Sequence, residues 1–261
     1  MESEFRELRV ERRGDVEILT IDRPDARNAL TFRTYAELER AVRETSARCL
    51  VITGAGTAFC SGDDVKQVMG GGDGRTGERL AAQAPRLTPA AEALLLSDVP
   101  VIAAVNGAAV GWGMELALLC DLRIAAERAK FGELFVLRGL CCDVAGLARL
   151  ASLVGREKAA ELLFTGDVID AREAERIGLV SRVVPDGEVL DAALALANRI
   201  AANPPLAVRR LKAGLREALD PDWQALGAWV SRSLAELFRT EDHREGVKSF
   251  LEKRAPRFVG R

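Results

Sequence analysis

Short β-rich runs alternate with helical stretches through the first half of the chain, and this alternation indicates an α/β fold. Residues 8–10 and 16–21 flank a charged turn and predict a hairpin, while residues 34–47 repeat apolar side chains at helical spacing. Residues 50–53 and 101–105 predict short buried strands, and each run ends at a glycine-containing loop. Because functional groups in α/β folds gather at strand ends, these loops are the first place to expect a site.

The second half is predominantly helical from about Gly146 onward. Asp170, followed by Glu173, predicts a capped helix over residues 171–177. Prolines 204 and 205 predict a helix start before residues 206–218, and Asp222 precedes an amphipathic run over residues 223–238. These late helices need a partner surface, either the first half of the chain or another subunit. Residues 70–74, with four glycines, predict a mobile loop.

Charge and hydropathy exclude two classes of partner. The 261 residues carry a formal charge of −2, which gives no global field for nucleic acid or an anionic membrane. The apolar runs are shorter than the roughly 18 residues of a membrane span, and the first residues do not resemble a signal peptide. We therefore expect a cytoplasmic protein, with neither nucleic-acid nor membrane partners.

Histidine and cysteine usage limits the chemistry. The chain has one histidine, His243, against 39 acidic residues, so proton transfer is expected to use Asp or Glu. His243 itself falls at a predicted helix start and is expected to make a surface or subunit contact. The five cysteines have no C-x-x-C spacing, and one histidine cannot complete a usual zinc set. We expect reduced, mostly buried thiols and no metal.

Two glycine-containing turns follow predicted strands. One contains Gly107, Gly111 and Gly113 ahead of the helical run 114–119, and the other spans residues 58–65 and is expected to lead into a helix. Such turns aim backbone N–H groups at whatever lies above them, so the pair predicts an oxyanion hole. Tight packing of helix on strand is the alternative. The spacing G-x-x-x-G-x-G does not match a dinucleotide-binding turn.

Matching segments run almost from end to end of the chain. They are residues 23–30, 50–54, 58–65, 100–107, 115–121, 163–166, 178–180, 240–242 and 245–247. In this order and spacing they resemble the enoyl-CoA hydratase/isomerase (crotonase) superfamily. The resemblance implies a spiral of ββα turns over residues 1–200 and a helical trimerisation region over residues 201–261. It also implies a homotrimer or hexamer and an acyl-CoA thioester substrate, with coenzyme A as part of the substrate rather than a separate cofactor.

The resemblance also assigns binding residues. It places the two oxyanion-hole N–H groups on Asp63 and on Trp112, which stands where the family commonly has glycine. The residues implied for coenzyme A are Ala26, Arg27, Lys66, Phe250 and Lys253. Arg and Lys suit phosphate groups electrostatically, although a solvated surface charge explains each of these cations equally well when taken singly.

The carboxyl groups depart from the hydratase pattern. In hydratases of this family two glutamates share one water; the first matches Glu115, and the second position is Phe135 here. Glu133 lies two residues early and, on a strand, would be displaced by roughly 6–7 Å. Asp143 matches an aspartate of the isomerase-like branches, so Glu115 and Asp143 are the expected catalytic pair. The alternative for Asp143 is a cap on the following helix.

Several activities remain open at this point. Isomerisation of an enoyl-CoA double bond fits the carboxyl groups better, while hydration is the commoner activity of the family. A non-catalytic acyl-CoA-binding or scaffolding member is a second possibility, since Phe135 and Trp112 both depart from the pattern. Thioester hydrolysis or decarboxylation is a third, because the same oxyanion hole serves those reactions.

Overall fold

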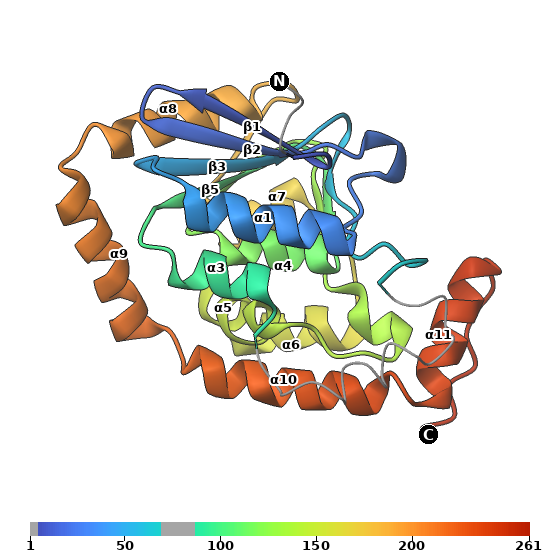
Figure 1. Ribbon diagram of the computed structural model, residues 1–261. Helices are drawn as coiled ribbons and strands as arrows, with labels where there is room; N and C mark the ends of the chain where they lie inside the picture. Colours follow the sequence, from blue (N-terminus) through green and yellow to red (C-terminus); the bar gives the residue numbers. More distant parts are fainter. Residues whose placement is uncertain (1–4, 69–86) are drawn as a thin grey trace.

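The computed structural model describes residues 5–68 and 87–261 and contains two sheets (Figure 1). The larger sheet has the order β1-β2-β3-β5-β7-β10. Its strands are β1 (Leu8–Arg13), β2 (Val16–Ile21), β3 (Cys49–Gly54), β5 (Val101–Val105), β7 (Leu122–Ala126) and β10 (Arg182–Val184). Only β1 and β2 pair antiparallel, as the predicted hairpin; every other pair is parallel.

The smaller sheet has the order β4-β6-β8-β9. It consists of β4 (Ala58–Cys60), β6 (Ala108–Val110), β8 (Lys130–Gly132) and β9 (Ile169–Asp170). Consecutive strands β3 and β4, β5 and β6, and β7 and β8 therefore divide between the two sheets, and α4 (Trp112–Leu119) follows the second pair. This repeated passage from one sheet to the other confirms the expected α/β spiral of ββα turns.

Helices cover both faces of the larger sheet. Beneath it lie α1 (Phe32–Glu44), α3 (Pro89–Leu96), α4, α5 (Val144–Val154), α6 (Arg156–Thr165) and α7 (Ala171–Arg176) (Figure 1). On the opposite face, α8 (Val189–Ala201) packs against Val16, Ile18 and Ile102. Leu19 and Ile21 point to the main core, so alternate residues of β2 serve two apolar layers.

The last three helices pass around the body. They are α9 (Pro205–Leu219) on the left, α10 (Trp223–Leu237) below and α11 (Glu241–Leu251) on the right in Figure 1. Helix α9 has one buried side chain, Lys212, whose ammonium group contacts the Asp121 carboxylate at 2.7 Å and the Val99 carbonyl oxygen at 2.8 Å. Leu211, Leu215 and Leu219 of the same helix are exposed.

Several local predictions are confirmed and one is wrong. Asp170 and Asp222 cap α7 and α10, and all five cysteines are free thiols, four of them buried. After Asp63 the Val68 N–H donates to the Asp64 carbonyl oxygen at 2.8 Å, and the rest of the helix expected there lies outside the described residues. Strand β8 ends at Gly132, so the strand geometry used to place Glu133 does not apply. The glycine-rich segment 70–74 lies outside the described residues. None of the described helices is long and apolar enough to cross a membrane.

Candidate active site

The turns after β4 and β6 pack closely against each other. A Cβ atom on Gly62 would lie 2.9 Å from the Val110 carbonyl oxygen and 3.3 Å from the Trp112 nitrogen, and Asp63 is the next residue along the chain. Leu30 pairs with the residues on either side of Asp63. Its N–H donates to the Gly62 carbonyl oxygen, and its carbonyl oxygen accepts the Asp64 N–H. In the part of the chain that the structure describes, no hydrogen bond uses the N–H of Asp63 or of Trp112, the first residue of α4. Both N–H groups are therefore without a hydrogen-bond partner among the described residues, as the donors of an oxyanion hole must be.

Close packing explains why the turn before α4 is rich in glycine. A Cβ atom on Gly113 would lie 2.0 Å from the Cys60 carbonyl oxygen, and one on Gly107 would lie 2.0 Å from the Thr57 carbonyl oxygen. Gly111 adopts a φ of 54° at the start of the helix. Tight packing, the alternative explanation for these glycines, is thus present together with the paired amides, because the packing brings the two turns together.

The side chains of Asp63 and Trp112 join in one polar chain. The Tyr35 hydroxyl donates to Asp63 Oδ1 at 2.6 Å, and the Tyr35 ring packs edge-on against Trp112 with ring centroids 4.7 Å apart. The indole N–H of Trp112 donates to Asp143 Oδ2 at 3.2 Å. Burial raises the pKa of Asp63 to about 6, while the hydrogen bond from Tyr35 opposes this rise.

Glu115 lies on α4 with no solvent exposure. The N–H groups of Ala145 and Gly146, in the first turn of α5, donate to its carboxyl oxygens at 3.1 Å. Gly146 favours this contact, because a Cβ atom there would lie 2.6 Å from Glu115 Oε1 and the carboxyl group would have to shift. Burial raises the pKa of Glu115 well above its usual value, and the charges of Glu133 and Asp143 add to that rise.

Asp143 belongs to the same cluster and also caps α5. Its Oδ1 accepts the N–H of Val144 at 2.7 Å, and its Oδ2 accepts the indole N–H of Trp112 and the hydroxyl of Thr88, each at 3.2 Å. Burial raises the pKa of Asp143, while these three donors favour its charged form. The helix-cap alternative is therefore confirmed, and it does not exclude a role in the site.

Glu133 is the carboxyl group whose position the sequence did not reveal. It precedes a 3-10 helix, η3 (Leu134–Arg138), and is 1% exposed. Neither of its carboxyl oxygens accepts a hydrogen bond from any described residue. Burial raises the pKa of Glu133 well above its usual value, and the charge of Asp143 adds to this effect. The sequence signal that could have revealed this position was a single glutamate among apolar residues, directly after the residues that form β8.

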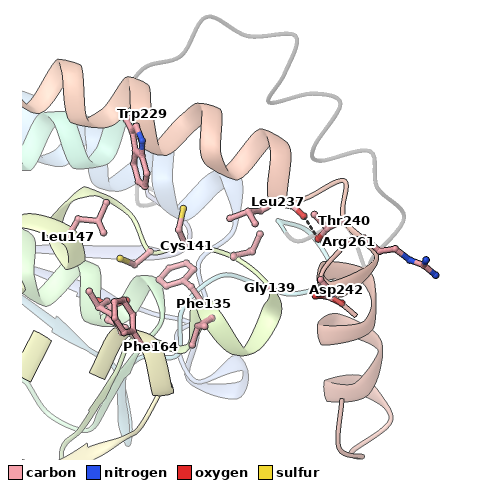
Figure 2. Close-up of a pocket in the computed structure, with 16 residues that line it drawn as sticks. Phe135, Gly139, Cys141, Leu147, Phe164, Trp229, Leu237, Thr240, Asp242 and Arg261 are labelled. Atoms are coloured by element: carbon pink, nitrogen blue, oxygen red, sulfur yellow. Dashed lines mark hydrogen bonds between the residues drawn. The ribbon is translucent and has the colours of Figure 1, made fainter. Parts of the chain in front are cut away.

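Glu133 also lines an apolar cavity of about 620 Å³ between η3, α6 and α10 (Figure 2). Phe135, at the second hydratase position, faces this cavity, with Trp229 of α10 and Phe164 of α6 on either side of it (Figure 2). Cys141 and Cys142 contribute to the same wall. The volume suits a small organic group, since typical ligand pockets are about 300–1,000 Å³.

The residues implied for coenzyme A fall into two groups. Ala26 and Arg27 lie against the segment that precedes Asp63, because the Arg27 carbonyl oxygen accepts the N–H of Ser61 at 3.1 Å, and Lys66 is exposed three residues after Asp63. Phe250 and Lys253 lie at the end of α11, where the Arg138 guanidinium stacks over the Phe250 ring at 4.1 Å. Among described residues, no hydrogen bond or ion pair joins the two groups.

His243 is not a surface residue, contrary to the expectation from sequence. It is 1% exposed, and its Nδ1 lies 2.8 Å from the Arg138 carbonyl oxygen. The ring of Phe238 packs edge-on against it. These contacts hold α11 against η3, so His243 is part of the packing rather than of the acid–base cluster.

Unpaired amide donors and buried carboxyl groups are the features that a site for oxyanion stabilisation and proton transfer requires. Residues 11–261 match the family model described as Enoyl-CoA hydratase/isomerase. The chain therefore belongs to this family of acyl-CoA enzymes, as its sequence motifs indicated.

Similar proteins share the full length of the chain. It is 39% identical to 2,3-dehydroadipyl-CoA hydratase of Escherichia coli, over 98% of this chain and 99% of the relative. It is 38% identical to crotonyl-CoA hydratase of Syntrophomonas wolfei, with the same coverage. The crystal structure of an enoyl-CoA hydratase/isomerase from Pseudoalteromonas atlantica superposes with a TM-score of 0.86 at 29% identity, covering 97% of this chain and 100% of that one.

Proposed function

We propose that this family member shifts the double bond of an enoyl-CoA thioester. The observation that carries this proposal is the pair of amides on Asp63 and Trp112 beside Glu115, combined with an apolar ring, Phe135, at the position of the second hydratase glutamate. Isomerisation needs a stabilised enolate and a proton carrier, whereas hydration also needs a group that activates water. The two amides would stabilise the enolate, and Glu115 would carry the proton, as isomerisation needs.

The amide pair would act on the thioester carbonyl. Removal of a proton from the α-carbon of a 3-enoyl thioester places negative charge on the carbonyl oxygen, and two fixed N–H donors stabilise that charge. Loss of one such donor typically costs about 2.7–4 kcal/mol of transition-state stabilisation. A proton returned at the γ-carbon then gives the conjugated 2-enoyl product.

Glu115 and Asp143 are the proposed catalytic carboxyl groups. Because burial and neighbouring charge raise the pKa of Glu115, this carboxyl is suited both to take and to return a proton. The Asp143 carboxyl accepts the indole N–H of Trp112, and its three donors oppose the rise in pKa that burial causes. We assign removal of the α-proton to Glu115 and the role of second carboxylate at the site to Asp143.

Hydration is the second candidate, favoured by the names of the two curated relatives, which are both hydratases. Hydration would require Glu133 to act with Glu115 on a water, because Phe135 stands where hydratases have their second glutamate. Thioester hydrolysis, decarboxylation and acyl-CoA binding without turnover are further outcomes that the same oxyanion hole permits.

An assay with 3-hexenoyl-CoA and crotonyl-CoA separates these activities. We expect isomerisation of 3-hexenoyl-CoA, with losses of about 10²- to 10⁴-fold in Glu115→Gln and smaller losses in Asp143→Asn. Glu127→Gln, an exposed glutamate paired with Arg172, is the matched control. Unaltered rates in both site variants would refute the catalytic assignment. Turnover of crotonyl-CoA alone would favour hydration, and binding without turnover would favour the non-catalytic reading.

Coenzyme A would bind along the surface that begins at the 3-10 helix η1 (Pro24–Ala26). We propose that Ala26 contacts the adenosine end, that Arg27 and Lys66 hold phosphate oxygens, and that Phe250 and Lys253 provide a further contact from α11. Arg27→Ala and Lys66→Ala should raise KM for an acyl-CoA while kcat stays constant, because these contacts are equal in the ground and transition states. Unchanged KM in both variants would contradict this placement.

A homotrimer, or a hexamer of two trimers, is the proposed assembly. Leu211, Leu215 and Leu219 form a stripe on α9 and are 60–74% exposed, which is unusual for three large apolar side chains on one helix face. Light scattering of the wild type should give three or six times the chain mass, and Leu215→Glu should lower it. A monomeric wild type would exclude this assembly.

The five free thiols support the proposed cytoplasmic location.

A further inference from the structure

We propose that Glu133 is a third catalytic carboxyl group, which delivers a proton to the acyl carbon beyond the double bond, on the side away from the thioester. The proposed substrate class is a β,γ-unsaturated acyl-CoA whose chain continues into the apolar cavity lined by Glu133. This inference rests on the proposed isomerase function and adds the identity of the second proton carrier.

Glu133 is buried without a partner, unlike the other two carboxyl groups. Glu115 accepts two amide N–H groups and Asp143 accepts three donors. Both oxygens of Glu133 lack any donor among the described residues, although the side chain is 99% buried. Buried polar groups are normally paired, since an unpaired one costs about 1–3 kcal/mol or more. A carboxyl group kept in this condition is arranged for a partner that arrives with the substrate.

The cavity places Glu133 further along the acyl chain than Glu115. Of the three carboxyl groups only Glu133 lines the cavity, and its charge adds to the rise that burial causes in the pKa of Glu115 on α4. In the proposed binding mode a thioester held at Asp63 and Trp112 has its α-carbon near Glu115 and its later carbons in the cavity, next to Glu133. The rest of the wall, including Phe135, is mainly apolar and suits a hydrocarbon tail.

The surroundings of Glu133 favour its neutral acid form. Burial and the charge of Asp143 both oppose ionisation of Glu133, and no donor among the described residues stabilises a carboxylate there. Burial raises the pKa of Asp143 as well, but three donors to its carboxyl oxygens oppose that rise. Glu133 has no such donor among the described residues, so its unpartnered carboxyl is the group that we propose as the proton donor.

The proposed step balances without another reactant. Glu115 accepts the proton as the C2–H bond breaks, and the electron pair delocalises over the dienolate, whose oxygen is held by the two amides. The O–H bond of Glu133 then breaks as a C4–H bond forms, and the double bond moves to C2=C3 while the thioester carbonyl is restored. Transfer of the proton from Glu115 to Glu133, directly or through water, returns both groups to their starting states.

Deuterium labelling tests whether Glu115 acts at C2 and Glu133 at C4. Wild type and Glu133→Gln are incubated with 3-hexenoyl-CoA in deuterium oxide, and the label at C2 and the yield of 2-hexenoyl-CoA are followed by mass spectrometry and NMR. Glu133→Gln should lower isomerisation by about 10²- to 10⁴-fold while exchange at C2 of the recovered substrate continues. Glu115→Gln should lower both, and Glu127→Gln should lower neither. Glu133→Asp, which retains a carboxyl group, should recover part of the isomerisation.

Each result bears on one proposal. A wild type that neither exchanges nor isomerises refutes the isomerase function itself. A wild type that isomerises, together with a Glu133→Gln variant of equal rate, refutes the role of Glu133 alone. Loss of C2 exchange and isomerisation together in Glu133→Gln, with a wild-type melting temperature, also refutes it, because Glu133 would then act at the α-carbon or through Glu115.

Discussion

Replacing Tyr35 by Phe removes one hydroxyl group and leaves the ring packed against Trp112. The lost hydrogen bond, 2.6 Å from the hydroxyl to Asp63 Oδ1, is the one side-chain bond to that carboxyl found among described residues. A hydrogen bond to a charged group contributes about 1.5–3 kcal/mol, and one between neutral groups about 0.5–1.5 kcal/mol. The cost of the substitution should therefore depend on whether Asp63 is ionised.

The pKa of Asp63 sets the pH window. Burial raises it from the usual 3.8 to about 6, so Asp63 is mostly neutral at pH 5 and mostly charged at pH 8. Because the folded pKa lies above the unfolded one, this group lowers stability as pH rises between the two values, and loss of the Tyr35 bond raises the folded pKa further. Tyr35→Phe should thus cost about 1 kcal/mol at pH 5 and about 2 kcal/mol at pH 8.

Urea unfolding of wild type and Tyr35→Phe at the two pH values measures this difference. Asp63→Asn and the double variant complete the cycle, and in the Asp63→Asn background the cost of Tyr35→Phe should lose its pH dependence. An equal cost at pH 5 and pH 8 in the wild-type background would refute the reasoning, since the bond would then not involve an ionising carboxyl group.

Three further substitutions probe packing, anchoring and capping. Gly113→Ala should destabilise the protein by about 3 kcal/mol or prevent folding, because the new Cβ would lie 2.0 Å from the Cys60 carbonyl oxygen. The control Gly214→Ala on α9 meets nothing within 4 Å and should be neutral or stabilising. Thermal melts compare the two variants. Lys212→Met should cost about 2–3 kcal/mol in chemical unfolding, less than for a fully buried pair because Asp121 is 27% exposed; no loss would show that the ion pair does not anchor α9. Thr240→Ala removes the acceptor for the His243 N–H and should cost about 1 kcal/mol, with faster amide exchange confined to the start of α11.

Local sequence signals predicted the elements well because their causes are local. Asp170 and Asp222 cap the helices that they precede, and the run 101–105 is a strand with those limits. The paired glycine turns were also predictable, since strand ends and glycines mark them in the sequence. Helix starts, strand runs and turns depend on neighbouring residues, which a sequence shows directly.

Contacts between distant segments were not predictable in the same way. Tyr35 and Asp63 are 28 residues apart, and nothing in either segment announces their hydrogen bond. Glu133 was placed by strand geometry, but the chain leaves the strand at Gly132 and enters η3, so a spacing argument made for a strand does not apply. The burial of His243 likewise depends on α11 folding back on η3.

The first turn of α5 fixes two acidic groups at once, because its amides hold Glu115 and its cap is Asp143. The cavity, by contrast, takes its shape from η3, α6 and α10. Under the proposed function, the acid–base groups and the acyl cavity would belong to largely different parts of the chain, with Glu133 common to both. Replacement of Phe164 or Trp229 would then change the acyl group that is accepted while the first turn of α5 stays the same. Gly146 would tolerate less change, because a Cβ atom there would lie 2.6 Å from Glu115 Oε1 and the carboxyl group would have to shift.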